Sequence, residues 1–272
     1  MMRLSNVRFL LAWGLALCMS SAMAAVPPPP KLPADAYFLV DASTGKVLVD
    51  HKGDLSLPSA SLTKIMTGYV LADEVDSGRA SLDDIISVSR TAWSQNPTFK
   101  GSSLMWIEPG KPVSLSDLER GVVISSGNDA SVAVAEHLAG TEASFVDVMN
   151  QLAGELGLDN TAYRNPHGLP HPEHRTTARD LATLSVALIN NHPEHYKIYK
   201  EQSFTYNGIK QYNRNSLLRS DSSVDGLKTG YTSEAGYGLV ASAQREGMRL
   251  VSVVLGSASK RTRASENSSL LN

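Results

Sequence analysis

The chain has 272 residues, with 25 basic and 27 acidic side chains and a formal net charge of −2 at pH 7. Because the charges are balanced and no run of like charge exceeds a few residues, the composition disfavours a nucleic-acid-binding protein. The length allows a large hydrophobic core, so the fold can be stable without disulfide bonds.

The N-terminal residues have the pattern of a secretory signal peptide. Basic residues come before an apolar stretch at residues 9–19, and residues 22–24 (Ala-Met-Ala) match the A-x-A pattern of a cleavage site. The stretch is shorter than the ~20 apolar residues of a transmembrane helix, which argues against an anchor. We therefore predict a signal peptide at residues 1–24. It contains Cys18, the only cysteine, and a lipid on this residue is disfavoured because Leu17 stands where a small residue is expected.

The next segment is predicted to lead into a β-hairpin and a helix. Residues 25–34 are rich in proline and are predicted to be a stiff tether. Two short apolar runs, at residues 37–41 and 46–50, are separated by turn-forming residues and predict the hairpin. From Ser61 the apolar residues recur every three or four positions, which predicts a helix that ends before Ser77.

Helices are predicted in the middle of the chain and strands near its end. The predicted helices are 114–119, 130–138, 143–156, 177–189 and 261–271, and the predicted strands are 224–232, 237–244 and 248–256. Residues 165–175 and 208–225 have the composition of loops. Because strands open and close the sequence, we predict an α+β fold, with an antiparallel sheet built from both termini and a helical insertion.

The stretch "PSASLTKIMT" (residues 58–67) places Ser61 and Lys64 three positions apart at a predicted helix start. That spacing puts both side chains on one helix face, roughly 5–6 Å apart at Cβ. A serine hydroxyl becomes a nucleophile when a base takes its proton, and a lysine can act as that base when burial or a nearby cation lowers its pKa. S-x-x-K is common by chance, so a capping serine beside a solvated lysine is the plainer interpretation of this stretch alone.

Two further stretches favour the catalytic interpretation. "SSGND" contains Ser126, Gly127 and Asn128, which by themselves could be a helix break and cap. "GLKTGYT" contains Lys228 and Thr229, which by themselves could be an exposed strand edge. S-x-x-K, S-D-N and K-T-G in this order are the signature of class A β-lactamases and penicillin-binding proteins, and Ser-Gly-Asn replaces Ser-Asp-Asn here.

With these motifs the sequence resembles the D-alanyl-D-alanine carboxypeptidases, which are low-molecular-weight penicillin-binding proteins. The resemblance also includes "YFLVDASTGKVL", "NPHGL", "YNGIKQYNRNSLL" and "MRLVSVVLG". It implies a penicillin-binding serine peptidase domain at residues 35–272, with a β-lactamase/transpeptidase-like fold. The activity implied is removal of the terminal D-alanine from peptidoglycan stem peptides during cell wall remodelling.

The resemblance implies a catalytic role for three residues and supporting roles for two others. Ser61 would attack the carbonyl of the penultimate D-alanine and form an acyl-enzyme, and Lys64 would be its base. Ser126 would relay a proton to the leaving D-alanine, helped by Lys228. Lys228 would also bind the terminal carboxylate and lower the pKa of Lys64, and Asn128 would hold Lys64 and the substrate amide.

Five more residues are implied to bind the substrate. Thr229 would meet the terminal carboxylate, and Gly230 would let the peptide approach the strand edge. The backbone N–H of Tyr231 would complete an oxyanion hole with that of Ser61, although several relatives carry histidine at position 231. Arg214 and Arg263 resemble the family arginines that order the site and attract the carboxylate.

The resemblance also implies the partners and the location. Stem peptides ending in D-Ala-D-Ala would be substrates, β-lactams would be covalent inhibitors, and no metal or cofactor would be needed. The protein would be exported to the periplasm or the outer face of the cytoplasmic membrane. Relatives usually continue into a β-rich domain and an amphipathic anchoring helix, whereas this sequence stops at Asn272.

Four other functions stay open at this point. A D,D-endopeptidase that cleaves peptidoglycan crosslinks would use the same acylation chemistry. A β-lactamase is disfavoured because no Glu-x-Glu-Leu-Asn-like segment lies between Asn128 and Lys228. His167, His171 and His174 could suggest a zinc hydrolase, but their segment is rich in proline and lacks an H-E-x-x-H helix. A wall-binding module without catalysis would not be acylated by penicillin.

Overall fold

The computed structural model describes residues 28–272. The predicted signal peptide and the first residues of the predicted tether lie outside this range. The described part of the tether already contacts the domain, because the Tyr37 hydroxyl donates a hydrogen bond to the Pro30 carbonyl at 3.3 Å. Ala34 is buried and Leu32 packs against the hydrophobic core.

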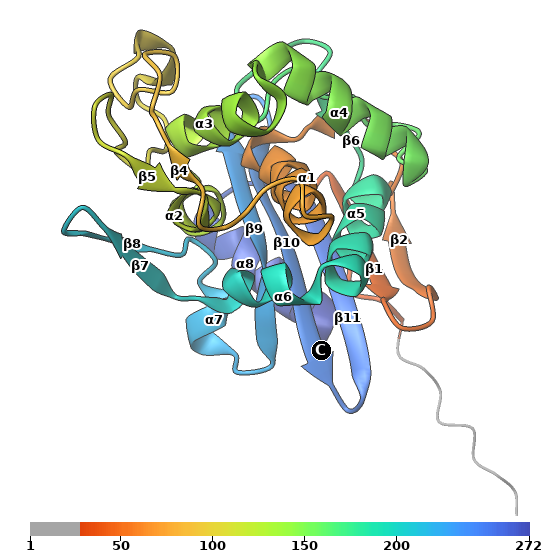
Figure 1. The fold of residues 1–272 in the computed structure, drawn as a ribbon. Helices are drawn as coiled ribbons and strands as arrows, with labels where there is room; N and C mark the ends of the chain where they lie inside the picture. Colours follow the sequence, from red (N-terminus) through yellow and green to blue (C-terminus); the bar gives the residue numbers. More distant parts are fainter. Residues whose placement is uncertain (1–27) are drawn as a thin grey trace, which may run out of the picture.

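The centre of the fold is a five-stranded antiparallel sheet with the strand order β2-β1-β11-β10-β9 (Figure 1). Its strands are β1 (Ala36–Asp41), β2 (Val47–His51), β9 (Val224–Thr232), β10 (Gly236–Arg245) and β11 (Met248–Ser257). The first and last strands of the sequence are neighbours, since β1 pairs with β11 and places Phe38 opposite Val253. The predicted sheet built from both termini is therefore confirmed.

Helices cover both faces of this sheet. Alternate residues of β1 belong to two separate hydrophobic clusters, Phe38 to one and Leu39 to the other, as the two-residue period of a strand requires. The helix α8 packs on β10 and β11, and α5 packs on β1 and β11. Figure 1 shows α1 and α5 in front of the sheet and α8 behind it. The helices are α1 (Lys64–Asp76), α2 (Leu115–Arg120), α3 (Asn128–Ala139), α4 (Glu142–Glu155), α5 (Ala178–Asn191), α6 (Pro193–Tyr196), α7 (Leu217–Ser220) and α8 (Lys260–Leu271).

Several short elements differ from the sequence-based predictions. Ser61 lies in the 3₁₀ turn η1 (Ala60–Thr63) rather than in the α-helix, which begins at Lys64. The segment predicted as a loop at 208–225 contains β8 and α7. The remaining short elements are β3 (Leu57–Pro58), β4 (Ile85–Ile86), β5 (Val113–Ser114), β6 (Arg175–Thr176), β7 (Ser203–Tyr206), β8 (Ile209–Tyr212), η2 (Pro97–Phe99), the π-helix η3 (Gly121–Ser125) and η4 (Lys197–Lys200).

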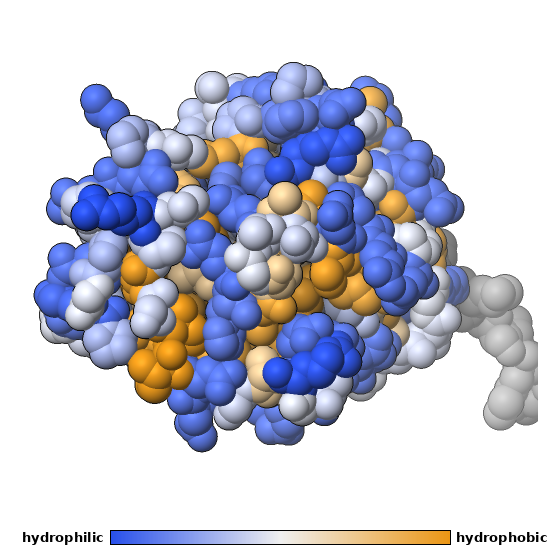
Figure 2. Space-filling model, turned by 45° about the horizontal axis from the view of Figure 1, so that its top comes forward, coloured by the Kyte–Doolittle hydropathy of each residue, from blue (hydrophilic) through white to orange (hydrophobic). Residues whose placement is uncertain are grey.

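On the face shown in Figure 2, hydrophobic residues gather in separate areas, the broadest at the lower left, with polar residues between them. Over residues 28–272, every helix is too short or too polar to be a membrane-spanning segment. The helix α2, predicted at 114–119, starts with a capping residue, because the Ser114 hydroxyl accepts a hydrogen bond from the Asp117 N–H at 3.1 Å.

A cluster of acidic and histidine side chains, of which Glu119 and His195 are buried, joins α1, α2 and α6. His195 Nδ1 lies 2.5 Å from Glu119 Oε1, and its Nε2 lies 3.5 Å from Asp76 Oδ1. Burial alone would lower the pKa of His195, but the hydrogen bonds and charges of Glu119 and Asp76 outweigh it and raise the pKa. The α2 helix that carries Glu119 leads directly into η3 and so to Ser126.

We expect His195→Ala to lower the free energy of unfolding by about 3 kcal/mol, because the carboxylate of Glu119 would stay buried without its partner. A raised folded-state pKa stabilises the fold fully below the ordinary histidine pKa of about 6.5, and this stabilisation is lost as the pH rises through the folded-state pKa. Urea unfolding of both proteins from about pH 5 to 9 measures the effect. The exposed His171→Ala is the control, and equal stability of His195→Ala and the parent near pH 6 would contradict the prediction.

Candidate active site

Ser61 lies at the bottom of a cavity of about 550 Å³ between η1, β9 and the start of α3. Residues three positions apart are eclipsed in a 3₁₀ turn, so the side chains of Ser61 and Lys64 lie one above the other. The Lys64 amine is 3.3 Å from the Ser61 hydroxyl oxygen. Lys64 is fully buried, so the amine approaches Ser61 from the protein interior.

The surroundings of Lys64 suit a neutral amine. Its Nζ donates to Asn128 Oδ1 at 2.7 Å and to the His167 carbonyl at 2.6 Å. A neutral amine has two hydrogens and one lone pair, so these two acceptors leave the lone pair for Ser61. Burial holds the pKa of Lys64 well below its ordinary value, the charge of Arg214 lowers it further, and Asp129 opposes this.

Ser126 and Asn128 come from the break between the π-helix η3 and α3. Ser126 has φ 61°, in the left-handed region, and this conformation points its side chain across the cavity. After Ser126, the N–H of Gly127 donates a hydrogen bond to the Gly121 carbonyl, and the N–H of Asn128 donates one to the Ser103 carbonyl. π-Helical turns are often found at functional sites, where they re-aim a side chain.

Lys228 reaches Ser126 from the edge strand β9. Its Nζ donates to the Ser126 hydroxyl at 2.8 Å, and the side chain is 3% exposed. Burial holds the pKa of Lys228 well below its ordinary value, and the charges of Lys64, Arg214 and Arg263 lower it further. The sequence reasoning named Lys228 as the cation that lowers the Lys64 pKa. The two buried amines repel each other, and Arg214 is a further cation that lowers the pKa of both. Lys228 is itself a buried amine whose charged form is disfavoured.

Close packing inside the protein explains why position 230 is a glycine. A Cβ at Gly230 would lie 3.1 Å from Leu62, 3.2 Å from the Ser59 carbonyl and 3.3 Å from Ala60. The glycine therefore allows β9 to pack closely against η1 inside the protein. Gly230 also lines the cavity, and its expected role in substrate access stays a prediction.

Thr229 and Tyr231 lie at the cavity on the same edge strand. The ring of Tyr231 is 53% exposed and stacks on Tyr237, with ring centroids 4.2 Å apart. The guanidinium of Arg263 lies 5.6 Å from the Tyr237 ring centroid. The side chain of Tyr231 therefore forms an aromatic wall of the cavity. The sequence reasoning had considered only its backbone N–H.

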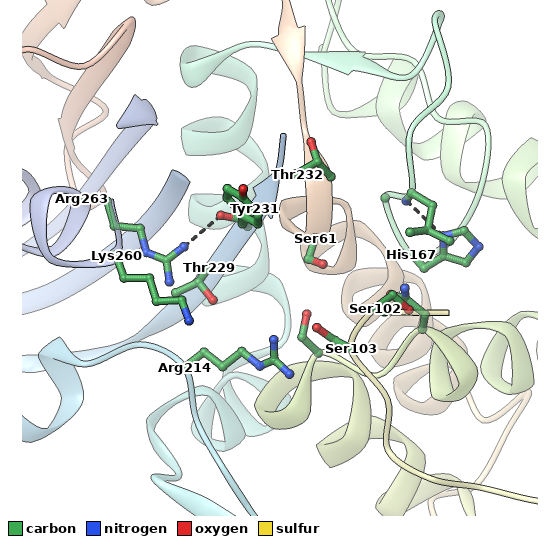
Figure 3. Close-up of a pocket in the computed structure, with 16 residues that line it drawn as sticks. Ser61, Ser102, Ser103, His167, Arg214, Thr229, Tyr231, Thr232, Lys260 and Arg263 are labelled. Carbon is green, nitrogen blue, oxygen red and sulfur yellow. Dashed lines mark hydrogen bonds between the residues drawn. The ribbon is translucent and has the colours of Figure 1, made fainter. Parts of the chain in front are cut away.

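Three cationic side chains gather on one side of Ser61 (Figure 3). Arg263 is buried and donates to the Gly230 and Gly238 carbonyls at 2.9 and 3.2 Å. Arg214 and Lys260 also line the cavity, and Lys260 was not predicted from the sequence. This side of the cavity is therefore suited to an anionic group.

The backbone of Arg214 is held on both sides by buried asparagines. Asn213 donates to the Tyr199 and Glu201 carbonyls, and Asn215 donates to the Gly226 carbonyl. The "YNRN" stretch thus contains one cationic side chain, Arg214, and the two asparagine side chains that hold its backbone in place.

The cavity has other walls that sequence reasoning missed. The carboxylate of Asp129 accepts the N–H groups of Met105 at 2.8 Å, Trp106 at 2.8 Å and Ile107 at 3.2 Å, and so ties the preceding loop to α3. The cavity residues missed by the sequence reasoning are Gly101, Ser102, Ser103, His167, Gly168, Leu169, Thr232 and Lys260.

The histidine segment has structural contacts in place of the zinc geometry considered above. His167 and His174 are buried, whereas His171 is exposed. Burial and the charge of Lys64 hold the pKa of His167 well below its ordinary value. Within residues 28–272, no group of three or more histidine, cysteine, aspartate or glutamate residues is arranged to hold a metal ion.

Known proteins share this sequence over most of its length. Residues 22–259 match the family model described as D-alanyl-D-alanine carboxypeptidase. The chain is 48% identical over 244 residues to the D-alanyl-D-alanine carboxypeptidase DacC of Escherichia coli (strain K12), a match that covers 89% of this chain and 61% of that protein. It is 32% identical over 242 residues to a D-alanyl-D-alanine endopeptidase of Pseudomonas aeruginosa, covering 83% of this chain and 74% of that protein.

Solved structures share the fold. Penicillin binding protein 5 from Haemophilus influenzae has a TM-score of 0.88 at 43% identity, covering 90% of this chain and 72% of that one. Penicillin-binding protein D2 from Listeria monocytogenes, in its ampicillin-bound form, has a TM-score of 0.79 at 31% identity, covering 90% and 98%. These matches confirm the predicted fold, and the chain spans about three fifths of the length of the first curated relatives. The chain belongs to the D-alanyl-D-alanine carboxypeptidase family.

Proposed function

We propose that this chain is a serine-type D-alanyl-D-alanine carboxypeptidase that removes the terminal D-alanine from peptidoglycan pentapeptide stems. One observation carries the proposal. The Ser61 hydroxyl lies at the cavity floor, 3.3 Å from a buried amine whose pKa is held low, with the Ser126–Lys228 pair also at the site. This arrangement supplies a nucleophile, its base and a second proton route in one site.

The acylation step follows from these positions. The neutral amine of Lys64 takes the proton of the Ser61 hydroxyl as the oxygen bonds to the carbonyl carbon of the penultimate D-alanine. The backbone N–H groups of Ser61 and Tyr231 would stabilise the oxyanion, because Ser61 lies at the start of a helical turn and Tyr231 lies on an edge strand. The C–N bond then breaks, and the leaving nitrogen takes a proton through Ser126 and Lys228. Water later cleaves the ester and frees Ser61.

The cationic wall explains the choice of a carboxylate-ended substrate. Arg214, Lys260 and Arg263 lie on one side of Ser61, and Thr229 offers a hydroxyl beside them (Figure 3). A peptide lying along the exposed edge of β9 would direct its terminal carboxylate to this wall, since extended peptides bind open sheet edges through main-chain hydrogen bonds.

The partners and location follow from the same proposal. β-Lactams would acylate Ser61 as substrate mimics, and ampicillin is bound in the similar penicillin-binding protein D2. A leader at residues 1–24 would export the protein to the periplasm or the outer face of the cytoplasmic membrane. Residues 35–272 would form the peptidase domain.

Intact-mass spectrometry after penicillin treatment, followed over time, tests the proposal. We expect the protein to gain the mass of one penicillin, with the modified peptide containing Ser61, and to lose it slowly. No mass gain would contradict the proposal, and rapid turnover of penicillin would indicate a β-lactamase. Release of D-alanine from pentapeptides, compared with cleavage of crosslinked dimers, separates a carboxypeptidase from the endopeptidase activity named for the Pseudomonas relative.

Lys228→Ala should weaken the use of carboxylate-ended peptides by about 10²-fold, because the terminal carboxylate loses an amine donor beside Thr229 and Ser126 loses its hydrogen-bond donor. The measurement compares kcat/KM for a peptide ending in a free carboxylate and for its amidated analogue. Lys197→Ala is the control, because its side chain is 60% exposed and pairs with Glu194. Equal losses on both peptides would contradict a role in carboxylate binding.

A further inference from the structure

The turn that presents Ser61 is conformationally strained. We call residues 59–63 the nucleophile turn. Ala60 within it has φ 46°, in the left-handed region that residues with a side chain rarely occupy. Such an outlier persists only where the surrounding structure holds it. The turn therefore needs contacts that fix Ala60, because Ser61 follows it directly.

Thr63 closes the nucleophile turn with its side chain. Its hydroxyl donates to the Ala60 carbonyl at 2.8 Å. The same oxygen lies 2.7 Å from the Ser59 hydroxyl oxygen and 2.9 Å from His174 Nε2. A threonine hydroxyl has one hydrogen and two lone pairs. Because the hydrogen goes to Ala60, both Ser59 and His174 must donate to Thr63.

The ring of His174 is oriented to make that donation. The Arg164 N–H donates to His174 Nδ1 at 3.3 Å, so the hydrogen of the neutral ring is on Nε2, facing Thr63. Burial lowers the pKa of His174 to about 4, and the charges of His171, Arg164 and Lys64 contribute. The ring is therefore neutral at neutral pH and keeps its acceptor at Nδ1.

The segment that carries His174 contacts the site at two other points, one at Lys64 and one at Ala60. The His167 carbonyl accepts a hydrogen bond from Lys64 at 2.6 Å. Gly168 lies against the turn so closely that a Cβ there would be 1.8 Å from the Ala60 carbonyl oxygen. Residues 167–174 thus contact both the base and the nucleophile turn.

We propose that His174 is a positioning residue for the nucleophile. Its Nε2–H fixes the Thr63 hydroxyl, and Thr63 in turn holds Ala60 in the conformation that places the Ser61 oxygen 3.3 Å from the Lys64 amine. The expected effect of His174 on activity rests on the proposed function. Sequence reasoning considered His174 only as a zinc ligand or a loop histidine.

A pair of substitutions at His174 separates hydrogen bonding from packing. His174→Gln keeps one donor and one acceptor, whereas His174→Leu fills the space with neither. We expect the acylation rate constant with a fluorescent penicillin to fall about 10- to 100-fold in His174→Leu, because small displacements of a nucleophile have large kinetic costs. His174→Gln should stay within about threefold of the parent. His171→Leu, on the same segment but exposed, is the control.

A double-mutant cycle with Thr63→Val tests the route. If His174 acts through Thr63, the two losses are not additive, and His174→Leu combined with Thr63→Val acylates no more slowly than the slower single variant. Additive losses would overturn the proposal. So would a parental rate in His174→Leu, or an equal loss in His174→Gln. Thermal unfolding of each variant confirms that the fold is intact.

A spectroscopic measurement keeps this inference separate from the proposed function. If the parent protein is not acylated at all, the proposed function fails, and nuclear magnetic resonance still tests the turn. The amide resonance of Ser61 should shift in His174→Leu and stay near its parental position in His174→Gln. An unshifted Ser61 amide in His174→Leu would overturn the positioning role.

Discussion

Ser61→Ala is expected to abolish covalent acylation by penicillin while the fold stays intact. The reacting oxygen is removed, and the structure places no second serine hydroxyl 3.3 Å from the Lys64 amine within residues 28–272. Loss of a serine nucleophile typically costs about 10⁶-fold in rate. The change removes one weak hydrogen bond at the cavity floor, so the free energy of unfolding should change by less than about 0.5 kcal/mol.

Intact-mass spectrometry of Ser61→Ala after penicillin treatment checks this result, with urea unfolding to verify the fold. Two control substitutions keep Ser61 and remove other hydroxyls. Ser77→Ala changes an exposed hydroxyl that donates to the Glu74 carbonyl, and Ser269→Ala changes an exposed hydroxyl on α8. Both should be acylated at nearly the parental rate. Residual labelling of Ser61→Ala would show that another residue is the nucleophile.

The sheet could be predicted from the sequence because its signals are local. The apolar runs before and after the turn at 41–46 form β1 and β2, and the segments around Arg245 form β10 and β11. Phe38 and Leu39 are neighbours in β1 but belong to two separate hydrophobic cores, one on each face of the sheet. In the sequence, this burial on both faces was visible as a continuous apolar run. A strand buried on both faces gives such a run.

The missed short elements have different causes. The β7–β8 hairpin has a local signal that was overlooked, because Phe204 and Tyr206 alternate with polar residues before an Asn-Gly turn. Gln211 in β8 donates to the Met105 carbonyl at 3.0 Å and ties the hairpin to the cavity loop. The 3₁₀ turn before Lys64 depends on a left-handed Ala60, which no residue preference predicts. These contacts join segments that are far apart in the sequence.

The central site residues could be identified because each lies in a motif, whereas their physical surroundings could not. The structure brings Ser61, Lys64, Ser126 and Lys228 together, and it adds Arg214 to the charges that lower the pKa of both buried amines. It also assigns the glycine after Thr229 to packing against η1. Which charges and atoms surround a buried amine depends on the folded arrangement of several loops, and the roles proposed for these residues stay predictions.

Substitution of Lys64 is expected to cause the second large loss of acylation rate. Two substitutions distinguish a role as the base from a role of its positive charge. Lys64→Met keeps the volume without a base, and Lys64→Arg keeps a positive charge that is not released at neutral pH. Both should lower the acylation rate by about 10²- to 10⁴-fold if the amine acts as the base. A parental rate in Lys64→Arg would mean that only the positive charge matters. Lys197→Met, at an exposed lysine, is the control.

The pH dependence of acylation tests the same assignment in the parent protein. Burial, followed by the charge of Arg214, holds the pKa of Lys64 well below that of an ordinary lysine. The amine is therefore neutral over a pH range in which an ordinary lysine is charged, and acylation should fall only as the pH drops through this lowered pKa. The residual acylation of Lys64→Met should lack that acidic limb. A parental rate that rises only near the ordinary lysine pKa of about 10.4 would exclude a pre-formed neutral base.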